Sequence, residues 1–157
     1  INTIKNYLNF LEKSFLFFSL SKFSYSLKKQ FSNPKKYYTV DFALSNAVSF
    51  KFSEDYGRLL ENLVLIELKR RGKDVYYHKA KKECDFVLKE GLKIVEAIQV
   101  TKQLDDDTRK RELDGLVDAL NSYELKEGLI LTDDQEDEFT YKDKKIIVKP
   151  VWKWLLS

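Results

Sequence analysis

The segment from Glu83 to Lys102 constrains the fold most, because it predicts two strands joined by a tight turn. β-Favouring side chains follow Asp85 in the first strand, and the second strand runs from Lys93 to Val100. Gly91 supplies the positive φ that a short hairpin connection needs. Alternation along the second strand puts Val95, Ala97, Gln99 and Thr101 on one face, and Ile94, Glu96, Ile98 and Val100 on the other.

Polar side chains are expected to gather at one end of this hairpin. Asp85 begins the first strand, while Glu96 and Gln99 lie late in the second. Magnesium prefers oxygen ligands and commonly takes only one or two carboxylates, so such an end can hold a divalent cation. The alternative is an ordinary amphipathic hairpin with solvated charges.

Length and composition favour one globular domain, with or without a small appendage. The chain has 157 residues, of which 43% are hydrophobic and 34% charged. It contains no apolar run long enough to cross a bilayer and no signal peptide, so we expect no membrane association. A single cysteine, Cys84, predicts no internal disulfide and a cytoplasmic location. Because the chain has one cysteine and one histidine, His78, we expect no structural zinc site. The chain begins at Ile1 and lacks methionine, which indicates a fragment of a longer polypeptide.

The first segment of the chain is basic. Residues 1–36 contain seven lysines and one acid, Glu12. This asymmetry favours a surface that faces phosphates, and Lys28, Lys29, Lys35 and Lys36 are the candidate nucleic-acid contacts. Cationic segments also occur in proteins that bind no nucleic acid.

The spacing of apolar residues predicts a helix over residues 2–12, then strands at residues 15–20 and 37–41 on either side of a basic loop. A helix followed by a hairpin with a basic tip resembles the second half of a winged helix. Aromatic rings between lysines can stack on bases. Alternatively, Phe15, Phe17, Tyr38 and Phe42 form core, which the periodicity favours.

Residues 55–71 predict a helix that is buried on most sides. Glu61 lies inside its apolar stretch and needs a cation, a metal or a hydrogen-bond partner. Glu67 is predicted to be solvated, or paired with the basic turn at residues 69–71. Gly72 is the expected C-cap.

The remaining elements follow from similar patterns. Residues 74–78 predict a strand, with His78 as a surface residue rather than a general base. Aspartates 105–107 are expected to cap a helix that ends near Asn121, with Arg111 close to Gln99. Residues 128–132 and the tail from Glu138 predict three more strands. We expect the two tryptophans, at positions 152 and 154, to pack the end of the chain.

The order of elements after Gly57 resembles the restriction-endonuclease-like fold of the PD-(D/E)XK superfamily. That resemblance implies a metal held by an acid on the first helix, an aspartate on the second strand, and an acid-x-lysine motif on the third. Glu61 and Asp85 match the first two positions. At the third, this sequence has Gln99-Val100-Thr101, which lacks both the charge and the lysine. Lys102 lies one position late, on the opposite face.

The chain also resembles the C-terminal domain of unknown function that prokaryotic, especially archaeal, AAA-type ATPases carry. The segments that carry this resemblance are GRLLENLVLIELKRRG, ECDFV and IQV, followed by Thr108, Arg111 and Glu112. The resemblance covers residues 1 to about 132. It implies that the segment before Gly57 is the tail of a winged helix, and that the ATPase domain, with its nucleotide site, lies upstream.

The sequence therefore predicts an α/β domain at residues 54–157, with a restriction-endonuclease-like three-layer core in which helices flank a central mixed sheet. A winged-helix remnant precedes it at residues 1–53. The first functional hypothesis is nucleic-acid binding with a degenerate Mg²⁺- or Mn²⁺-dependent phosphodiesterase site. Its residues are Glu61, Asp85 and Gln99, helped by Glu83, Glu96 and Lys102. The alternatives are an inactive interaction or oligomerisation module of the ATPase, and a DNA-binding regulator acting through residues 22–36.

Overall fold

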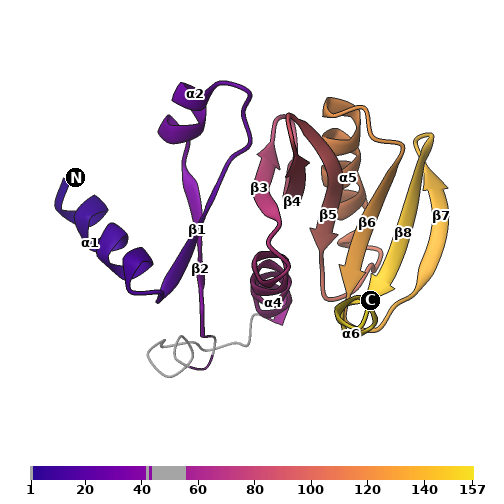
Figure 1. The fold of residues 1–157 in the computed structure, drawn as a ribbon. Helices are drawn as coiled ribbons and strands as arrows, with labels where there is room; N and C mark the ends of the chain where they lie inside the picture. The colour runs from indigo at the N-terminus through magenta and orange to yellow at the C-terminus, as the bar shows by residue number, and fades with distance from the viewer. Residues whose placement is uncertain (1, 42, 44–55) are drawn as a thin grey trace.

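A six-stranded mixed sheet forms the centre of the molecule (Figure 1). The computed structural model describes residues 2–41, 43 and 56–157. The strands lie in the order β3-β4-β5-β6-β8-β7. They are β3 (Asp74–Lys79), β4 (Glu83–Glu90), β5 (Lys93–Val100), β6 (Glu127–Thr132), β7 (Asp137–Tyr141) and β8 (Lys144–Pro150).

The direction of each strand follows from the connection before it. Strands β3, β4 and β5 form an antiparallel meander, because short turns join them. Helix α5 (Arg109–Ser122) carries the chain from β5 to β6, which makes these two strands parallel. Strand β8 is parallel to β6 and antiparallel to β7. The β7–β8 turn uses Lys142 and Asp143 with φ of 50° and 62°, as a tight hairpin turn requires.

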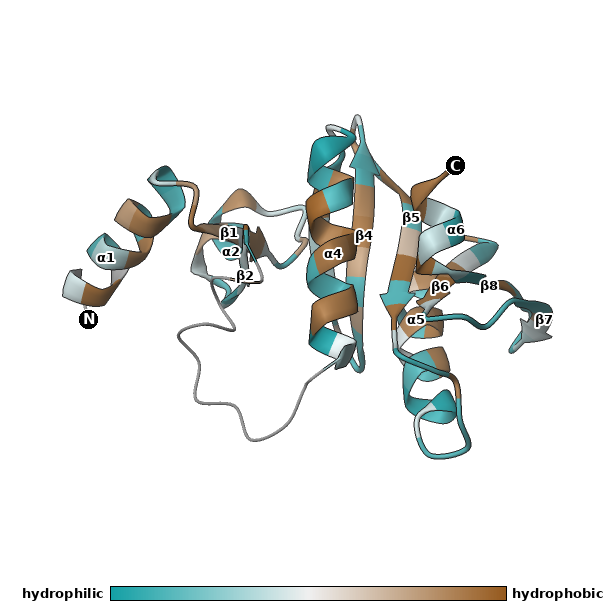
Figure 2. Cartoon of the chain, turned by 90° about the horizontal axis from the view of Figure 1, so that it is seen from below, coloured by the Kyte–Doolittle hydropathy of each residue, from teal (hydrophilic) through white to brown (hydrophobic). Residues whose placement is uncertain are grey.

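Helices cover both faces of this sheet. Helices α4 (Tyr56–Arg70) and α6 (Val151–Leu155) pack on one face, where Leu65, Phe86 and Ile98 belong to one buried cluster. Helix α5 packs on the other face, where Leu116 and Ile130 belong to a second cluster. Figure 2 shows apolar bands along α4, β4 and β5. The predicted mixed sheet flanked by helices is therefore confirmed.

The predicted faces of β5 are partly wrong. A register shift between Leu88 and Lys89 places an extra residue in β5, because Lys89 pairs with Ile94 whereas Leu88 pairs with Glu96. Ile94 consequently joins the same buried cluster as Ala97, although strict alternation puts them on opposite faces. From Glu96 onward the predicted alternation holds, and Ile98 and Val100 lie in the other cluster.

The N-terminal segment, residues 2–41, contains a two-stranded antiparallel sheet. Its elements are α1 (Asn2–Lys13), β1 (Phe17–Ser21), α2 (Leu27–Ser32) and β2 (Lys35–Thr39). Both predicted strands are present, but the second begins at Lys35, two residues earlier than predicted. Helix α2 forms within the predicted basic loop, with Ser26 as its N-cap. Tyr38 is buried, as predicted, whereas the side chain of Phe15 is 74% exposed. Phe42 lies outside the described residues.

This segment attaches to the free edge of β3. The Phe23 amide donates to the Tyr77 carbonyl at 2.9 Å, and Lys22 and Tyr77 form a parallel bridge. The Tyr77 hydroxyl donates to the Pro34 carbonyl at 2.6 Å. Leu20 of β1 belongs to the same core cluster as α4 and β4. The segment is therefore packed against the body rather than merely tethered to it.

Three further expectations need correction. Glu67 is buried rather than solvated, although it does pair with Arg70 and Arg71, as expected. Helix α5 begins at Arg109 rather than directly after the aspartates, although Asp105 Oδ1 makes a cap-like contact by accepting from the Thr108 amide at 2.8 Å. Trp154 is buried, but Trp152 is exposed. Among the helices of the described residues, none is long and apolar enough to span a membrane.

Candidate functional site

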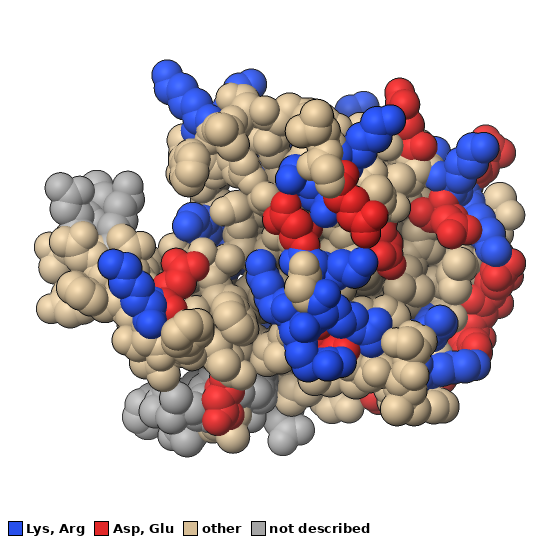
Figure 3. Space-filling view, in the orientation of Figure 1, with Lys and Arg blue, Asp and Glu red and all other residues tan. Residues whose placement is uncertain are grey.

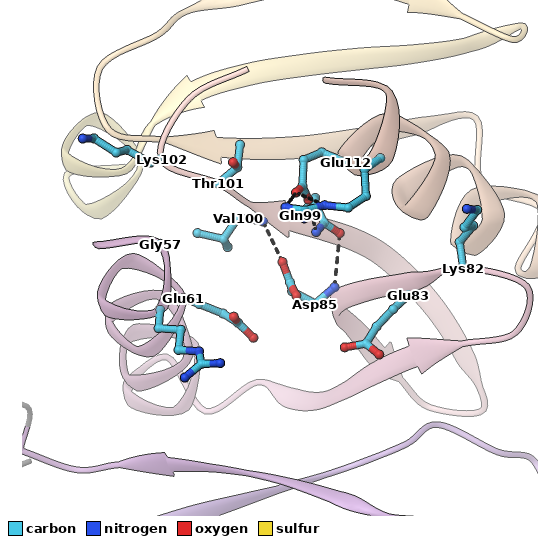
Figure 4. Close-up of a pocket in the computed structure, with 12 residues that line it drawn as sticks. Gly57, Glu61, Lys82, Glu83, Asp85, Gln99, Val100, Thr101, Lys102 and Glu112 are labelled. Carbon is cyan, nitrogen blue, oxygen red and sulfur yellow. Dashed lines mark hydrogen bonds and ion pairs between the residues drawn. The ribbon is translucent and has the colours of Figure 1, made fainter. Parts of the chain in front are cut away.

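An open pocket of about 530 Å³ lies where the start of α4, the first residues of β4, the end of β5 and the first turn of α5 meet (Figure 4). Its floor is acidic and several basic residues surround it. The lining residues are Gly57, Arg58, Glu61, Lys82, Glu83, Asp85, Gln99, Val100, Thr101, Lys102, Arg111 and Glu112. The fold thus brings Glu61, Asp85, Gln99 and Lys102 to one pocket, as the sequence predicted.

Asp85 is held in the floor of the pocket by the neighbouring strand. Its Oδ2 accepts a hydrogen bond from the Val100 amide at 3.0 Å, and its own amide donates to Gln99 Oε1 at 3.3 Å. Burial, followed by the nearby charge of Glu61, raises the pKa of Asp85 to about 7. At neutral pH the Asp85 carboxyl group therefore populates both its charged and its neutral form.

Gln99 has both of its amide atoms engaged. Its Oε1 accepts from the Asp85 amide, and its Nε2 donates to Glu112 Oε2 at 2.6 Å. Glu112 is in turn held by Arg111, whose Nη2 lies 2.6 Å from Glu112 Oε1. The position of Arg111 beside Gln99 is confirmed, but the role of Glu112 was missed. Glu112 belongs to the sequence pattern of the family resemblance, but that pattern does not show that its side chain contacts Gln99.

Gly115 allows α5 to approach this floor. A Cβ atom at this position would overlap the Glu83 carbonyl oxygen and lie 3.7 Å from Gln99 Oε1. Any larger residue would push the helix, and with it Glu112, away from the sheet.

The N-terminal segment contributes a cation, Lys36, to three carboxylates of the pocket. Lys36 Nζ lies 2.8 Å from Glu83 Oε1, 3.3 Å from Glu61 Oε1 and 3.3 Å from Asp85 Oδ1. Burial alone would lower the pKa of Lys36, but the charges of Asp85 and Glu61, together with Glu83, raise it above its ordinary value. The Lys36 ammonium therefore stays charged and serves three carboxylates at once.

Tyr38 completes the partners of Glu61. It lies two residues after Lys36 on β2, so both side chains point to the same face, toward the body. The Tyr38 hydroxyl donates to Glu61 Oε1 at 2.6 Å. The predicted need of Glu61 for a cation or hydrogen-bond partner is confirmed, with both partners coming from the segment before α4. Sequence reasoning assigned Lys36 to nucleic acid and Tyr38 to the core, and could not connect either with Glu61.

The other predicted residues lie at different places. Lys102 lines the pocket, with its ammonium 5.6 Å from the centre of the Tyr56 ring. Glu96 does not line the pocket; the charges that act on its carboxyl group are those of Lys73 and other residues near the β4–β5 turn. Lys28 and Lys29 are exposed on α2, and Lys35 Nζ donates to Ser19 Oγ at 3.4 Å.

The residues present do not fit a magnesium ion in this arrangement. The Lys36 ammonium lies among the carboxylates that would be the ligands, and the carbonyl oxygen of Gln99 already accepts a backbone hydrogen bond. Within the described part of the chain, no group of three or more His, Cys, Asp or Glu residues could hold a metal ion. No catalytic step through a metal follows from this geometry.

His78 is buried, which corrects the expectation of a surface residue. Its Nδ1 lies 2.9 Å from the Tyr123 hydroxyl and its Nε2 lies 3.1 Å from Asp118 Oδ2. Burial lowers the pKa of His78 despite the opposing effect of Asp118. A neutral ring with both nitrogens satisfied is a structural link between β3 and α5.

Two family models match the chain, and both describe domains of unknown function. DUF8612 matches residues 1–55, and DUF4143 matches residues 56–154. The uncharacterized protein MJ1544 of Methanocaldococcus jannaschii is 33% identical over 165 residues, covering 98% of this chain and 36% of that relative. An uncharacterized protein of Haemophilus influenzae is 33% identical over 123 residues, covering 78% of this chain and 30% of that relative.

This chain thus spans about a third of the length of the curated relatives that it matches. No solved structure was found to match it. Because the DUF4143 model covers more than half of the chain, including every pocket residue described above, the protein belongs to the DUF4143 family.

Proposed function

We propose that residues 56–154 form a PD-(D/E)XK-like domain that has lost metal-dependent catalysis and uses its acidic pocket to hold the preceding segment. The observation that carries this proposal is the position of Lys36 Nζ among Glu61, Glu83 and Asp85. In this function, the domain is an interaction module that fixes the N-terminal segment within a longer polypeptide.

The relation to PD-(D/E)XK domains is supported by the order of the elements and by the pocket. An acid on the first helix of the domain, an aspartate on the second strand and Gln99 on the third meet at one point. The loss of catalysis is supported by the residues at the third position of the superfamily pattern, where an acid-x-lysine motif is expected. Gln99 brings no charge, and Thr101 donates to the Gln103 carbonyl where the superfamily has a lysine.

The partner in this proposal is the rest of the same polypeptide. The curated relatives are about three times as long as this chain, which is consistent with an upstream domain. The best indication of what that domain is comes from the sequence segments that resemble the AAA-type ATPase family. A cytoplasmic location belongs to the same proposal.

Hydrogen exchange in Lys36→Met, compared with Lys35→Met, tests the docking function. We expect faster exchange of the β1 and β2 amides in Lys36→Met, because the ammonium that joins β2 to α4 and β4 is removed. Lys35 is the matched control, since it is on the other face of β2 and contacts Ser19. Equal exchange of β1 and β2 in both variants contradicts the proposal.

A second measurement separates docking from the catalytic alternative. Titration with Mn²⁺ and a DNA cleavage assay, run on wild type and Asp85→Ala, should show neither binding nor cleavage. Metal-dependent cleavage that disappears in Asp85→Ala would establish a surviving phosphodiesterase site and overturn the proposed loss of catalysis.

A further inference from the structure

The N-terminal segment has a cationic and aromatic surface that the docking of Lys36 leaves uncovered. Between residues 13 and 40 the sequence contains six lysines and no acid. Figure 3 shows blue Lys and Arg side chains projecting over α2, and a larger blue cluster beside red Asp and Glu side chains near the centre of the molecule. This segment therefore forms a local positive field on a molecule of mixed charge.

Large aromatic rings are exposed on the same segment. The exposed fractions of Tyr25, Phe31 and Tyr37 are 75%, 81% and 44%. Rings this exposed add little to the core, and burial of each would be favourable by roughly 25 cal/mol per Å² of apolar surface. Their exposure is therefore a cost to the isolated chain that a bound partner can remove.

The ring of Tyr25 is positioned by contact with a buried aromatic residue. The ring of Phe23, which is buried, contacts Tyr25 edge to face at a centroid distance of 5.0 Å. Phe23 itself packs against Tyr76 at 5.4 Å and Tyr123 at 5.5 Å. The Tyr25 ring is thus fixed to the body while most of its surface faces outward, which lowers the entropy cost of stacking on it.

A pocket opens beside this ring. It has a volume of about 600 Å³ and is lined by Tyr25, by the first residues of β5, and by residues at and just after the end of α5. These lining residues are Tyr25, Lys93, Ile94, Val95, Ser122, Tyr123, Glu124 and Leu125. The lining is mixed, with aromatic and apolar residues beside Lys93 and Glu124, which carry opposite charges. The aromatic rings offer faces on which a base can stack.

The lysines lie next to the exposed rings. Lys28 and Phe31 are three residues apart on α2 and share one side of the helix. Lys35 and Tyr37 share the outer face of β2, opposite Lys36 and Tyr38. Among the described residues, no carboxylate pairs with Lys28, Lys29 or Lys35. These cations keep their charge available for an external anion.

We propose that this surface binds single-stranded nucleic acid, with bases stacked on Tyr25, Phe31 and Tyr37 and phosphates held by Lys28, Lys29 and Lys35. Residues 13–40 contain no acid, which favours a polyanion over a protein partner, whose surface carries both signs of charge. On α2 and β2 the exposed rings alternate with lysines and form no continuous apolar helix face, which favours unpaired bases over a membrane at this surface. The inference is independent of the proposed docking function, because it uses none of the pocket carboxylates.

Fluorescence anisotropy with a labelled oligothymidylate of about 20 nucleotides tests the proposal on the whole chain. Tyr25→Ala and Phe31→Ala should each weaken binding about fivefold or more, since stacking on one base contributes at least 1 kcal/mol, a roughly fivefold effect. The Lys28→Gln, Lys29→Gln double variant should reduce the slope of log Kd against log salt by about 1.4, because two phosphate contacts are lost.

Matched controls come from α6. Trp152 has a ring that is 58% exposed, and Lys153 is a partly exposed lysine on the same helix. Trp152→Ala and Lys153→Gln should leave the affinity for oligothymidylate unchanged. The substituted residues are on the surface, so circular dichroism should confirm that every variant remains folded.

Several outcomes would overturn the proposal. These are the absence of binding to oligothymidylate, equal or tighter binding to a duplex of the same length, and unchanged affinity in both aromatic variants. Binding to vesicles that contain phosphatidylserine, without binding to the oligonucleotide, would assign the surface to a membrane instead.

Discussion

Two glutamates on α4, Glu61 and Glu67, obtain their counter-ions in opposite ways. Glu67 pairs with Arg70 and Arg71, three and four residues later on the same helix, each at 2.6 Å. Glu61 pairs with Lys36, 25 residues earlier, and accepts from Tyr38, 23 residues earlier. The first arrangement follows from the period of a helix, whereas the second exists only because β2 packs against α4.

The two arrangements also differ in their balance of charge. Two arginines serve the single carboxylate of Glu67, whereas the Lys36 ammonium is shared by the carboxylates of Glu61, Glu83 and Asp85, of which Glu83 also pairs with Lys79 at 3.0 Å. Hydrogen bonds from Arg70 and then Arg71 lower the pKa of Glu67 to about 2. The pKa of Asp85 moves the other way, to about 7. Two cations on the same helix therefore stabilise the Glu67 carboxylate, whereas Glu61 and Asp85 share one ammonium that comes from a distant segment.

The largest expected effect is that of Lys36→Met on stability. Removal of the Lys36 ammonium takes an ion-pair partner from the largely buried carboxylates of Glu61 and Asp85, which should lower the free energy of unfolding by about 3–5 kcal/mol. Urea denaturation at neutral pH measures this change. Lys35→Met should stay within about 0.5 kcal/mol of wild type, as for other surface substitutions. Similar stabilities for the two variants would show that the pocket does not depend on Lys36.

The pH dependence of stability should have opposite signs for Asp85 and Glu67. Folded Asp85 keeps its proton up to about pH 7, whereas an unfolded aspartate loses it near pH 4, so the folded state binds more protons between these values. Stability then falls as pH rises through this window, by no more than about 1.4 kcal/mol per pH unit. Glu67 has a lowered pKa, so its contribution is present above the unfolded pKa and is lost as pH falls toward 2.

Urea denaturation across this pH range, in wild type, Asp85→Asn and Glu67→Gln, measures both contributions. Asp85→Asn should flatten the decline between about pH 4 and 7. Glu67→Gln should instead remove part of the loss below about pH 4. A decline in Asp85→Asn as steep as in wild type would assign the effect to another group.

The sequence was sufficient where structure depends on neighbouring residues. Helix α4, the β4–β5 hairpin and the pairing of Glu67 with arginines follow from periodicity, glycine and charge spacing. The hairpin pattern placed Asp85 near Gln99, whereas the addition of Glu61 to them followed from a family resemblance. Two features escaped local rules, namely the bulge in β5 that moves Ile94 and the hydrogen bond from Gln99 to Glu112. Both depend on how separate elements pack.

Lys36 is the clearest limit of sequence reasoning in this chain. A lysine in a basic, acid-free stretch predicts a solvent-facing cation, and this holds for Lys28, Lys29 and Lys35. Lys36 differs only because it is on the inner face of β2, which packs against acids that occur 25 and more residues later. The strand alternation gives two faces, but only the tertiary fold shows which face is turned toward the acids.

The smallest expected effect separates the two arginines of Glu67. Arg70 has a side chain that is 70% exposed, so Arg70→Met should hardly change the urea midpoint. Arg71 also donates to the Trp154 carbonyl at 3.0 Å and lies 4.5 Å from the centre of the Trp154 ring. Arg71→Met should therefore lower the free energy of unfolding by about 1–2 kcal/mol, through contacts with α6 as well as with Glu67. This loss stays below that of Lys36→Met because Glu67 keeps Arg70 as a second cation. If Arg71→Met were as damaging as Lys36→Met, the number of cations available to a carboxylate would not explain the difference between the two ends of α4.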